Sequence, residues 1–309
     1  MSAQTEAQAV GTTALPRLQI DPVERFRRLL MIPSVVPLLV WMVVPLALTI
    51  IYSFLRYNLL SGTAVTFSGF QNYAFLVGDA SFFPAIINTV VFTGSVLLIS
   101  VVAGVLLAVL YDQDFIGKNV AMLLVIAPFF VMPTVSALVW KNMIMHPVNG
   151  LISLFLQQFG LAPIDWFGDY PMISIIIIVS WEWVPFAFLI LVTALKSLDQ
   201  EQREAAAIDG AGPLTQFWYI TLPHLEKAIG VVVMIETIFL LSIFAEIYTT
   251  TGGGPGNATT TLAYLVYSLG LQQFDAGIAS AGGILAVVLA NIVSIFLVRM
   301  LARNLKQEI

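Results

Sequence analysis

Cysteine is absent from the 309 residues of this chain, and histidine occurs only twice, as His146 and His224. Without cysteine the chain has neither a disulfide framework nor a thiolate metal site, and two histidines so far apart in the sequence form no metal-binding motif. Charged residues are also scarce, at 10% of the chain, while hydrophobic residues make up 59% and the mean hydropathy is +0.93. This composition excludes a water-soluble globular protein and predicts a membrane protein with several spans.

A phosphate-binding loop is missing as well. The nearest match to the pattern Gly-x-x-x-x-Gly-Lys-Ser/Thr is at Gly117 and Lys118, but Asp112 stands where the first glycine is required and Asn119 follows the lysine. The sequence also shows no nucleophile paired with a base, no cluster of metal ligands and no basic patch for nucleic acid. We therefore expect a chain that is not an enzyme, binds no cofactor or metal itself, and does not hydrolyse ATP alone.

Long apolar runs are the main positive feature of the sequence. A helix needs about 20 apolar residues to cross a hydrocarbon core of about 30 Å, and the segments that meet this requirement are 29–54, 84–111, 119–144, 171–195, 228–249 and 276–300. Prolines inside or near these spans can kink the helices, namely Pro33, Pro37, Pro45, Pro128, Pro133 and Pro185. The predicted fold class is an all-α membrane protein with six transmembrane helices.

Lysine and arginine determine the predicted orientation, because they collect on the cytoplasmic side of membrane proteins. With both termini in the cytoplasm, only Arg56 and Lys141 lie outside or within a span. The other eleven of the thirteen basic residues lie on the inner face: Arg17, Arg25, Arg27, Arg28, Lys118, Lys196, Arg203, Lys227, Arg299, Arg303 and Lys306. We expect a disordered cytoplasmic tail at 1–28, a transmembrane domain at 29–300 and a second cytoplasmic tail at 301–309.

The polar segment 196–227 separates the fourth and fifth predicted spans. Within it, residues 199–208 are predicted to form a short helix with Asp199 as its N-cap, acidic residues in its first turns and Gly210 just after its end. In the predicted orientation this helix is displayed on the cytoplasmic face.

The same segment resembles the EAA loop of permease subunits of binding-protein-dependent ABC importers. The resemblance rests on the residue types and spacing of Glu204, Ala205, Asp209, Gly210, Ala211, Phe217, Ile220, Leu222 and Pro223. It implies that the helix docks in a cleft of an ATP-hydrolysing subunit and couples its closure to transport through Glu204, Ala205, Ala206, Asp209, Gly210 and Ala211. Small alanine side chains allow a close approach to a groove, while the two carboxylates supply polar anchors. The alternative is a helical connector without such a function.

The resemblance extends from Leu30 to Leu305 and implies the transmembrane subunit of a type I ABC importer in the inner membrane. The implied partners are a second homologous permease subunit, two ATPase subunits that bind ATP and Mg, a periplasmic solute-binding protein and the lipid bilayer. Within the carbohydrate (maltose-type) group, mannitol and sorbitol permeases are most similar to segments 132–143, 179–186, 244–251 and 274–281. These segments favour a polyol as the solute, and a mono- or disaccharide is the alternative within the class.

Carboxylates inside spans are costly and indicate function. Helical spacing places one such group on a single face of the fourth span, namely Val179, Glu182, Trp183 and Phe186, and another within about 120° on the fifth span, namely Glu236, Phe239, Leu240, Ile243 and Glu246. The resemblance to maltose-type permeases implies solute contacts at these two faces. Carboxylates accept hydrogen bonds from hydroxyl groups and aromatic rings cover C–H faces, so we expect a path for an uncharged, hydroxyl-rich solute.

Two other interpretations of these acids stay open at this point. The first is that both faces merely pack the helix bundle, with the acids paired to a partner subunit and Glu246 near the water interface. The second is an autonomous secondary transporter with Glu182 or Glu236 as its proton site. Such a transporter has no use for the EAA-like loop, and the chain shows no inverted repeat.

Overall fold

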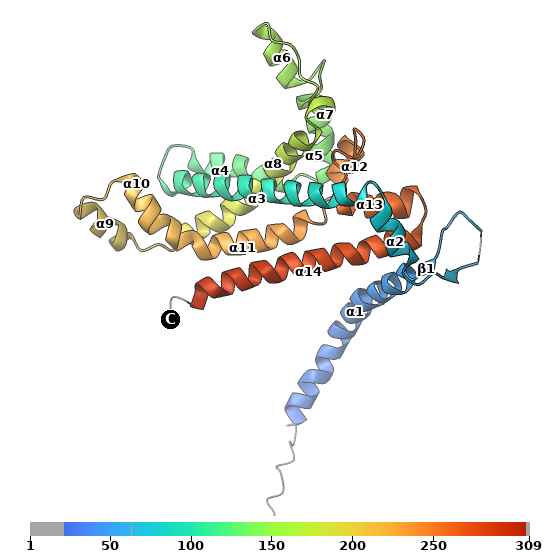
Figure 1. The fold of residues 1–309 in the computed structure, drawn as a ribbon. Coiled ribbons are helices and arrows are strands. Elements are labelled where there is room, and N and C mark those ends of the chain that lie inside the picture. The colour runs from blue at the N-terminus through green and yellow to red at the C-terminus, as the bar shows by residue number, and fades with distance from the viewer. Residues whose placement is uncertain (1–21, 63, 307–309) are drawn as a thin grey trace, which may run out of the picture. The chain divides into compact units, whose positions relative to one another are not determined.

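The computed structural model describes residues 22–62 and 64–306, and most of these residues are helical (Figure 1). Contacts divide the chain into one unit that ends at Leu48 and a second that begins at Thr49. The first unit contains most of α1 (Pro22–Ser53), which is a continuous helix through its three internal prolines, Pro33, Pro37 and Pro45.

The second unit contains two short strands and the other helices. They are β1 (Leu55–Arg56), β2 (Thr66–Phe67), α2 (Gln71–Gly78), α3 (Phe82–Asp112), α4 (Lys118–Ile126), the 3-10 turn η1 (Ala127–Phe130), α5 (Pro133–Val139), the π turn η2 (Trp140–Ile144), α6 (Leu151–Gln158), α7 (Trp166–Asp169), α8 (Pro171–Leu195), α9 (Gln200–Ile208), α10 (Pro213–Gln216), the π turn η3 (Phe217–Thr221), α11 (Leu222–Leu240), α12 (Ala245–Thr250), α13 (Leu262–Tyr267), the π turn η4 (Ser268–Gln272) and α14 (Ala276–Lys306). The strands pair antiparallel, with Leu55 opposite Phe67.

The disordered tail predicted at 1–28 needs correction where the structure describes it, whereas no conformation was predicted for the tail at 301–309. Residues 1–21 and 307–309 lie outside the described residues, but α1 already begins at Pro22 and α14 continues to Lys306. The adjoining parts of segments 1–28 and 301–309 are therefore helical extensions of the first and last spans.

Four of the predicted spans are confirmed, with ends that agree within a few residues. Within the described residues, the helices long and apolar enough to cross a membrane are Leu30–Ser53, Phe82–Asp112, Pro171–Leu195 and Ala276–Phe296, with mean hydropathies between 2.2 and 2.6. The third predicted span, 119–144, is bent by 105° between Phe130 and Pro133, and counts as a fifth span if the bent pair crosses as one. Proline lacks a backbone N–H and disfavours helical conformation in the residue before it, which is consistent with the break before Pro133.

The fifth predicted span, 228–249, is likewise not one helix. α11 ends at Leu240, residues 241–244 turn the chain, and α12 begins at Ala245. α11 also includes Glu226, Lys227 and Glu236, and it is not among the four strongly apolar helices. This break separates Glu246 from the helix that bears Glu236.

The core of the second unit is built on the packing of α3 against α8, with α11 in contact with both. Figure 1 shows α9 and α10 beyond the ends of α3 and α11, on the side opposite to α12 and α13. A Cβ atom added at Gly104 of α3 would lie 2.8 Å from the Cβ of Ala187 on α8, so the two backbones approach unusually closely there. Small residues at helix contacts permit such an approach inside membranes.

Three buried clusters follow the helices from the α9 end to the opposite end. The first joins α3, α8 and α11 near α9 and includes Val105, Ala108, Tyr111, Phe188, Leu191, Leu195, Leu225 and Val232. The second includes Phe92, Val96, Ile175, Val179, Leu240, Ile247 and Tyr264, and the third joins α2, α13, η4 and the start of α14. The second cluster forms one wall beside the cavity described below.

Candidate functional site

A cavity of about 290 Å³ lies where η1 and α5, α8, the end of α11 and α12 meet. Five of the predicted path residues line it: Glu182, Trp183, Phe239, Ile243 and Glu246. They come from three different helices and the turn before α12, so the two faces predicted from helical spacing do converge on one space.

The two acids in this cavity, Glu182 and Glu246, are both buried. Their carboxyl groups face each other, and Ser136 Oγ of α5 lies beside Glu182 without making a hydrogen bond of ordinary geometry. Oε1 of Glu182 accepts no hydrogen bond from any residue that the structure describes. A buried acceptor without a donor is costly, so this oxygen is suited to receive a hydrogen bond from a bound molecule.

The break after α11 places Glu246 at the cavity. It lies in the first turn of α12, where the N-terminal end of a helix favours a carboxylate. At the other end of α12, Lys141 Nζ donates hydrogen bonds to the carbonyl oxygens of Thr249 at 3.2 Å and Thr250 at 2.5 Å. A cation at the last carbonyls stabilises a helix end, so Lys141 attaches α12 to the turn that follows α5.

Aromatic rings form another wall of the cavity. Trp183 lies with its ring centroid 5.4 Å from that of Phe239 and 6.1 Å from that of Phe129. Phe129 in turn stacks on Phe186, with an interplanar angle of 26°. Phe129 and Phe244 also line the cavity, although helical spacing in the sequence did not indicate them. Phe129 is brought there by the break between Pro128 and Pro133, which the sequence indicates only as a kink.

The remaining predicted path residues lie outside the cavity. Val179 and Leu240 are buried in the second cluster, and Phe186 contributes to the aromatic group. Glu236 is completely buried between helices, where its carboxylate accepts a hydrogen bond from Ser100 Oγ of α3. The structure therefore separates the three acids into a facing pair and one acid that joins α11 to α3.

The helix predicted at 199–208 is confirmed as α9. The Asp199 carboxylate accepts a hydrogen bond of 3.0 Å from the backbone N–H of Glu201, and Gly210 has a φ of +85°, which glycine adopts without strain. The predicted coupling residues Glu204, Ala205, Asp209 and Gly210 are exposed, while Ala206 and Ala211 are half-buried. α9 thus presents a polar, accessible surface.

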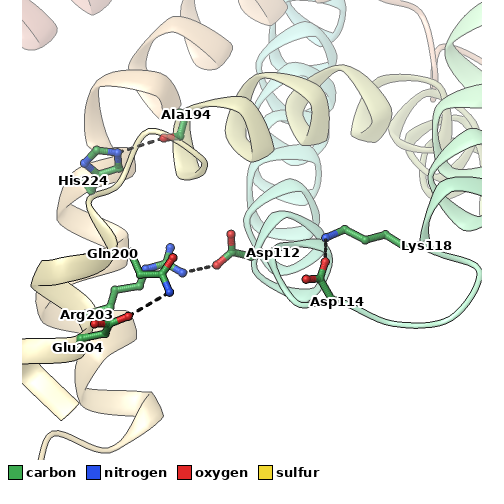
Figure 2. A network of polar contacts seen from close by, with 8 residues as sticks. All are labelled: Asp112, Asp114, Lys118, Ala194, Gln200, Arg203, Glu204 and His224. Carbon is green, nitrogen blue, oxygen red and sulfur yellow. Dashed lines mark hydrogen bonds and ion pairs between the residues drawn. The ribbon is translucent and has the colours of Figure 1, made fainter. Parts of the chain in front are cut away.

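Polar contacts attach this end of the molecule to the long helices, as Figure 2 shows. Arg203 of α9 forms an ion pair with Asp112, the last residue of α3. His224 Nε2, near the start of α11, lies 3.1 Å from the carbonyl oxygen of Ala194 near the end of α8. The described residues contain no group of three or more His, Asp or Glu side chains that could hold a metal ion.

Comparison with known proteins agrees with this architecture. Residues 86–307 match the family described as "Binding-protein-dependent transport system inner membrane component". "Probable ABC transporter permease protein y4oQ" of Sinorhizobium fredii is 31% identical over 298 residues, which cover 96% of this chain and 95% of the relative. The trehalose/maltose transport system permease protein MalF of Thermococcus litoralis is 34% identical over 228 residues, or 72% of this chain and 76% of the relative.

A solved structure of a bacterial ABC transporter that imports the acidic polysaccharide alginate contains a chain of the same fold. The two chains superpose with a TM-score of 0.77 at 24% identity, and the match covers 91% of this chain and 96% of the other. This likeness confirms the predicted all-α fold, which is that of the transmembrane chain in this importer.

Proposed function

Since this chain belongs to the family of inner membrane components of binding-protein-dependent transport systems, we propose that it forms half of the path for a small, neutral sugar or polyol. In this proposal a second permease subunit supplies the other half, two ATPase subunits drive the cycle, and a periplasmic binding protein delivers the solute. The observation on which the solute class rests is the facing pair of buried acids in an aromatic cavity.

The chemistry of the cavity supports a hydroxylated and uncharged solute. Glu182 and Glu246 offer acceptors to hydroxyl groups, and Trp183, Phe239 and Phe129 offer ring faces to C–H groups. An anionic solute would find no counter-charge here, because the cavity lining contains two acidic side chains and no basic one. At about 290 Å³ the cavity is at the lower end of the range for ligand sites, about 300–1,000 Å³.

The narrower choice lies between polyols and sugars. The relative from Thermococcus litoralis is named for trehalose and maltose, which favours a mono- or disaccharide, whereas the segments resembling mannitol and sorbitol permeases favour a polyol. Both classes present hydroxyl groups to the carboxyl pair. Competition by mannitol, sorbitol, glucose and maltose in one uptake assay separates them.

The α9 end supplies the proposed contact with the ATPase subunit. Glu204 and Asp209 form the polar part of this surface, and the small residues Ala205, Ala206, Gly210 and Ala211 lie between and beside them. Beside it, large apolar side chains are exposed on and after α9, namely Ile208, Leu214, Trp218 and Tyr219. A group of exposed apolar residues among polar ones is typical of a surface that binds another protein. We place this end, and both termini, in the cytoplasm.

Glutamine substitutions at the facing acids test the solute path. Hydrogen bonds to charged groups are worth about 1.5–3 kcal/mol, so Glu182→Gln or Glu246→Gln should weaken uptake by about ten-fold or more. The assay is ATP-driven uptake into vesicles that contain the complete complex and its binding protein.

Glu236→Gln is the matched control, because it replaces a buried carboxyl group outside the cavity. Its amide oxygen can still accept the hydrogen bond from Ser100, so we expect altered stability with little change in solute dependence. If both cavity variants assembled and transported like the wild type, the solute path would have to lie in the partner permease.

A further inference from the structure

The ion pair between Arg203 and Asp112 joins α9 to a helix that precedes it by 91 residues in the sequence. No residue of α9 is fully buried, and its other side-chain hydrogen bonds to described residues are local: Asp199 caps it, and Gln200 donates to Glu204 at 3.1 Å. In the part of the chain that the structure describes, Arg203 makes the one ion pair between α9 and a long helix (Figure 2). The orientation of α9 relative to the bundle therefore depends on this contact.

The Arg203–Asp112 pair differs from an ordinary surface pair. Its side chains are only 29% and 24% exposed, and the guanidinium Nε is buried. The neighbouring pair between Lys118 and Asp114 joins residues four apart, and the Asp114 side chain is fully exposed at 101%. Exposed pairs of that kind contribute little, whereas the partial burial of Arg203 and Asp112 reduces the screening of their attraction by water and salt.

Asp112 ends a helix that contacts both helices of the solute path. Farther along α3, Gly104 lies against Ala187 of α8, and Ser100 donates a hydrogen bond to Glu236 of α11. α8 bears Glu182 and Trp183, and α11 bears Phe239. A displacement applied at Asp112 therefore reaches the two cavity-lining helices through close contacts.

The surroundings of the pair leave room for α9 to move. A cavity of about 490 Å³ lies between the ends of α3 and α8 and the exposed face of α9, and Lys196, Gln200 and Glu204 help to line it. Close packing does not hold α9 in place on this side, so the ion pair is the element that would make α9 and α3 move together.

We propose that the Arg203–Asp112 pair is a positioning link that makes α9 and α3 move as one body when the ATPase subunits close. This inference rests on the proposed function, because it needs an ATPase bound at α9. It assigns Arg203 to a contact within this chain, distinct from the surface that faces the ATPase.

The test measures the distance between α9 and α3 directly. Spin labels at Gln202→Cys and Leu106→Cys, both at exposed positions, report this distance by pulsed electron resonance in an otherwise cysteine-free complex with its ATPases. With the wild-type pair, adding a non-hydrolysable ATP analogue should leave the distance unchanged. In Arg203→Gln or Asp112→Asn it should broaden or shift by about 2 Å, the size of typical helix shifts at interfaces.

Two matched variants complete the experiment. The reversed pair, Asp112→Arg with Arg203→Asp, should restore the unchanged distance, and Asp114→Asn with Lys118→Gln should leave it as in the wild type. If a single change prevents assembly, restored assembly in the reversed pair supports the link and continued failure overturns it. The proposed link is also overturned if Arg203→Gln and Asp112→Asn assemble and keep the wild-type distance between α9 and α3 when the ATP analogue is added. A wild-type chain that binds no ATPase would instead overturn the proposed function, and the link with it.

Discussion

The cavity and the α9 end of the helix bundle present opposite kinds of site. At the cavity, the acids Glu182 and Glu246 are buried and face each other from different helices. At the α9 end, Glu204 lies exposed on a short helix that Arg203 attaches to α3, and Asp209 lies exposed at the C-cap of that helix. The cavity is therefore defined by tertiary packing, whereas the α9 surface is defined by local sequence.

This difference predicts how each end responds to mutation. Changes on the exposed face of α9 should alter coupling with little effect on stability, because they remove few internal contacts. Changes in the packing of α3, α8 and α12 should alter stability and the cavity together. The experiments below test the α9 end and the cavity with different variants, beginning with the change that should have the greatest effect.

The largest expected effect is an all-or-none difference in accessibility across the membrane. The chain has no cysteine, so a single introduced thiol gives a signal without background. Asn257→Cys should react with a membrane-impermeant maleimide from outside, and Gln202→Cys and Gln113→Cys only after permeabilisation. All three positions are exposed, whereas Ser153 is buried and unsuitable. Labelling of Gln202→Cys from outside would contradict a cytoplasmic ATPase contact.

Gly210→Pro should have the next largest effect. Gly210 has a φ of +85°, and proline is restricted to about −65°, so the turn after α9 must change direction. The strain exceeds about 1 kcal/mol, and ATP-driven uptake should fall by about ten-fold or more while the protein still inserts in the membrane. Uptake and the yield of the assembled complex are the measurements.

Gly212→Ala is the control for this change. Gly212 has a φ of −69°, and an added Cβ atom would meet nothing within 4 Å. Normal uptake is expected. An equal loss of uptake in Gly210→Pro and Gly212→Ala would show that the segment tolerates no substitution. The positive φ of Gly210 would then not explain the effect of proline.

The contrast also explains what could be predicted from sequence. The bounds of α9 follow from Asp199 and Gly210, because an N-cap residue and a glycine that ends a helix each act over a few neighbouring residues. The four confirmed spans follow from length and hydropathy in the same local way. The role of α9 in coupling stays a prediction, since it depends on a partner.

The cavity could be predicted only in part, because its form depends on where helices break. Three prolines leave α1 continuous, yet Pro133 begins a new helix after a bend of 105°. Whether proline breaks a helix depends on whether neighbouring groups satisfy the freed carbonyls, which a single sequence does not show. Helical periodicity likewise placed Glu236 and Glu246 on one face, but the turn at 241–244 puts them on separate helices.

Gly104→Ala should destabilise the bundle by a moderate amount. Its Cβ atom would lie 2.8 Å from Ala187 Cβ and 3.2 Å from Leu191 Cδ1, so α3 and α8 must separate slightly. Overpacking of this kind costs about 1–3 kcal/mol. Thermal unfolding of the complex in detergent should therefore occur at a lower temperature. Gly94→Ala is the control on the same helix, because nothing lies within 4 Å of its added Cβ atom; a lower unfolding temperature there would contradict the packing argument.

Lys141→Gln should have the smallest effect, and it probes how Glu246 is held at the cavity. The change weakens the contacts of residue 141 with the carbonyl oxygens of Thr249 and Thr250 at the end of α12. Lys141 is half-buried and water competes for the same carbonyls, so the loss should be about 1 kcal/mol or less, as for other cations at helix ends. The concentration for half-maximal uptake should rise by about five-fold at most, while the maximal rate stays near the wild-type value.

Lys141→Arg retains charged donors and should restore uptake, whereas Lys118→Gln removes a cation at the α9 end and should not alter solute dependence. Unchanged half-saturation in Lys141→Gln would show that α12 keeps its position without this contact, and the cavity would then depend on the packing of Ile247 and its neighbours alone.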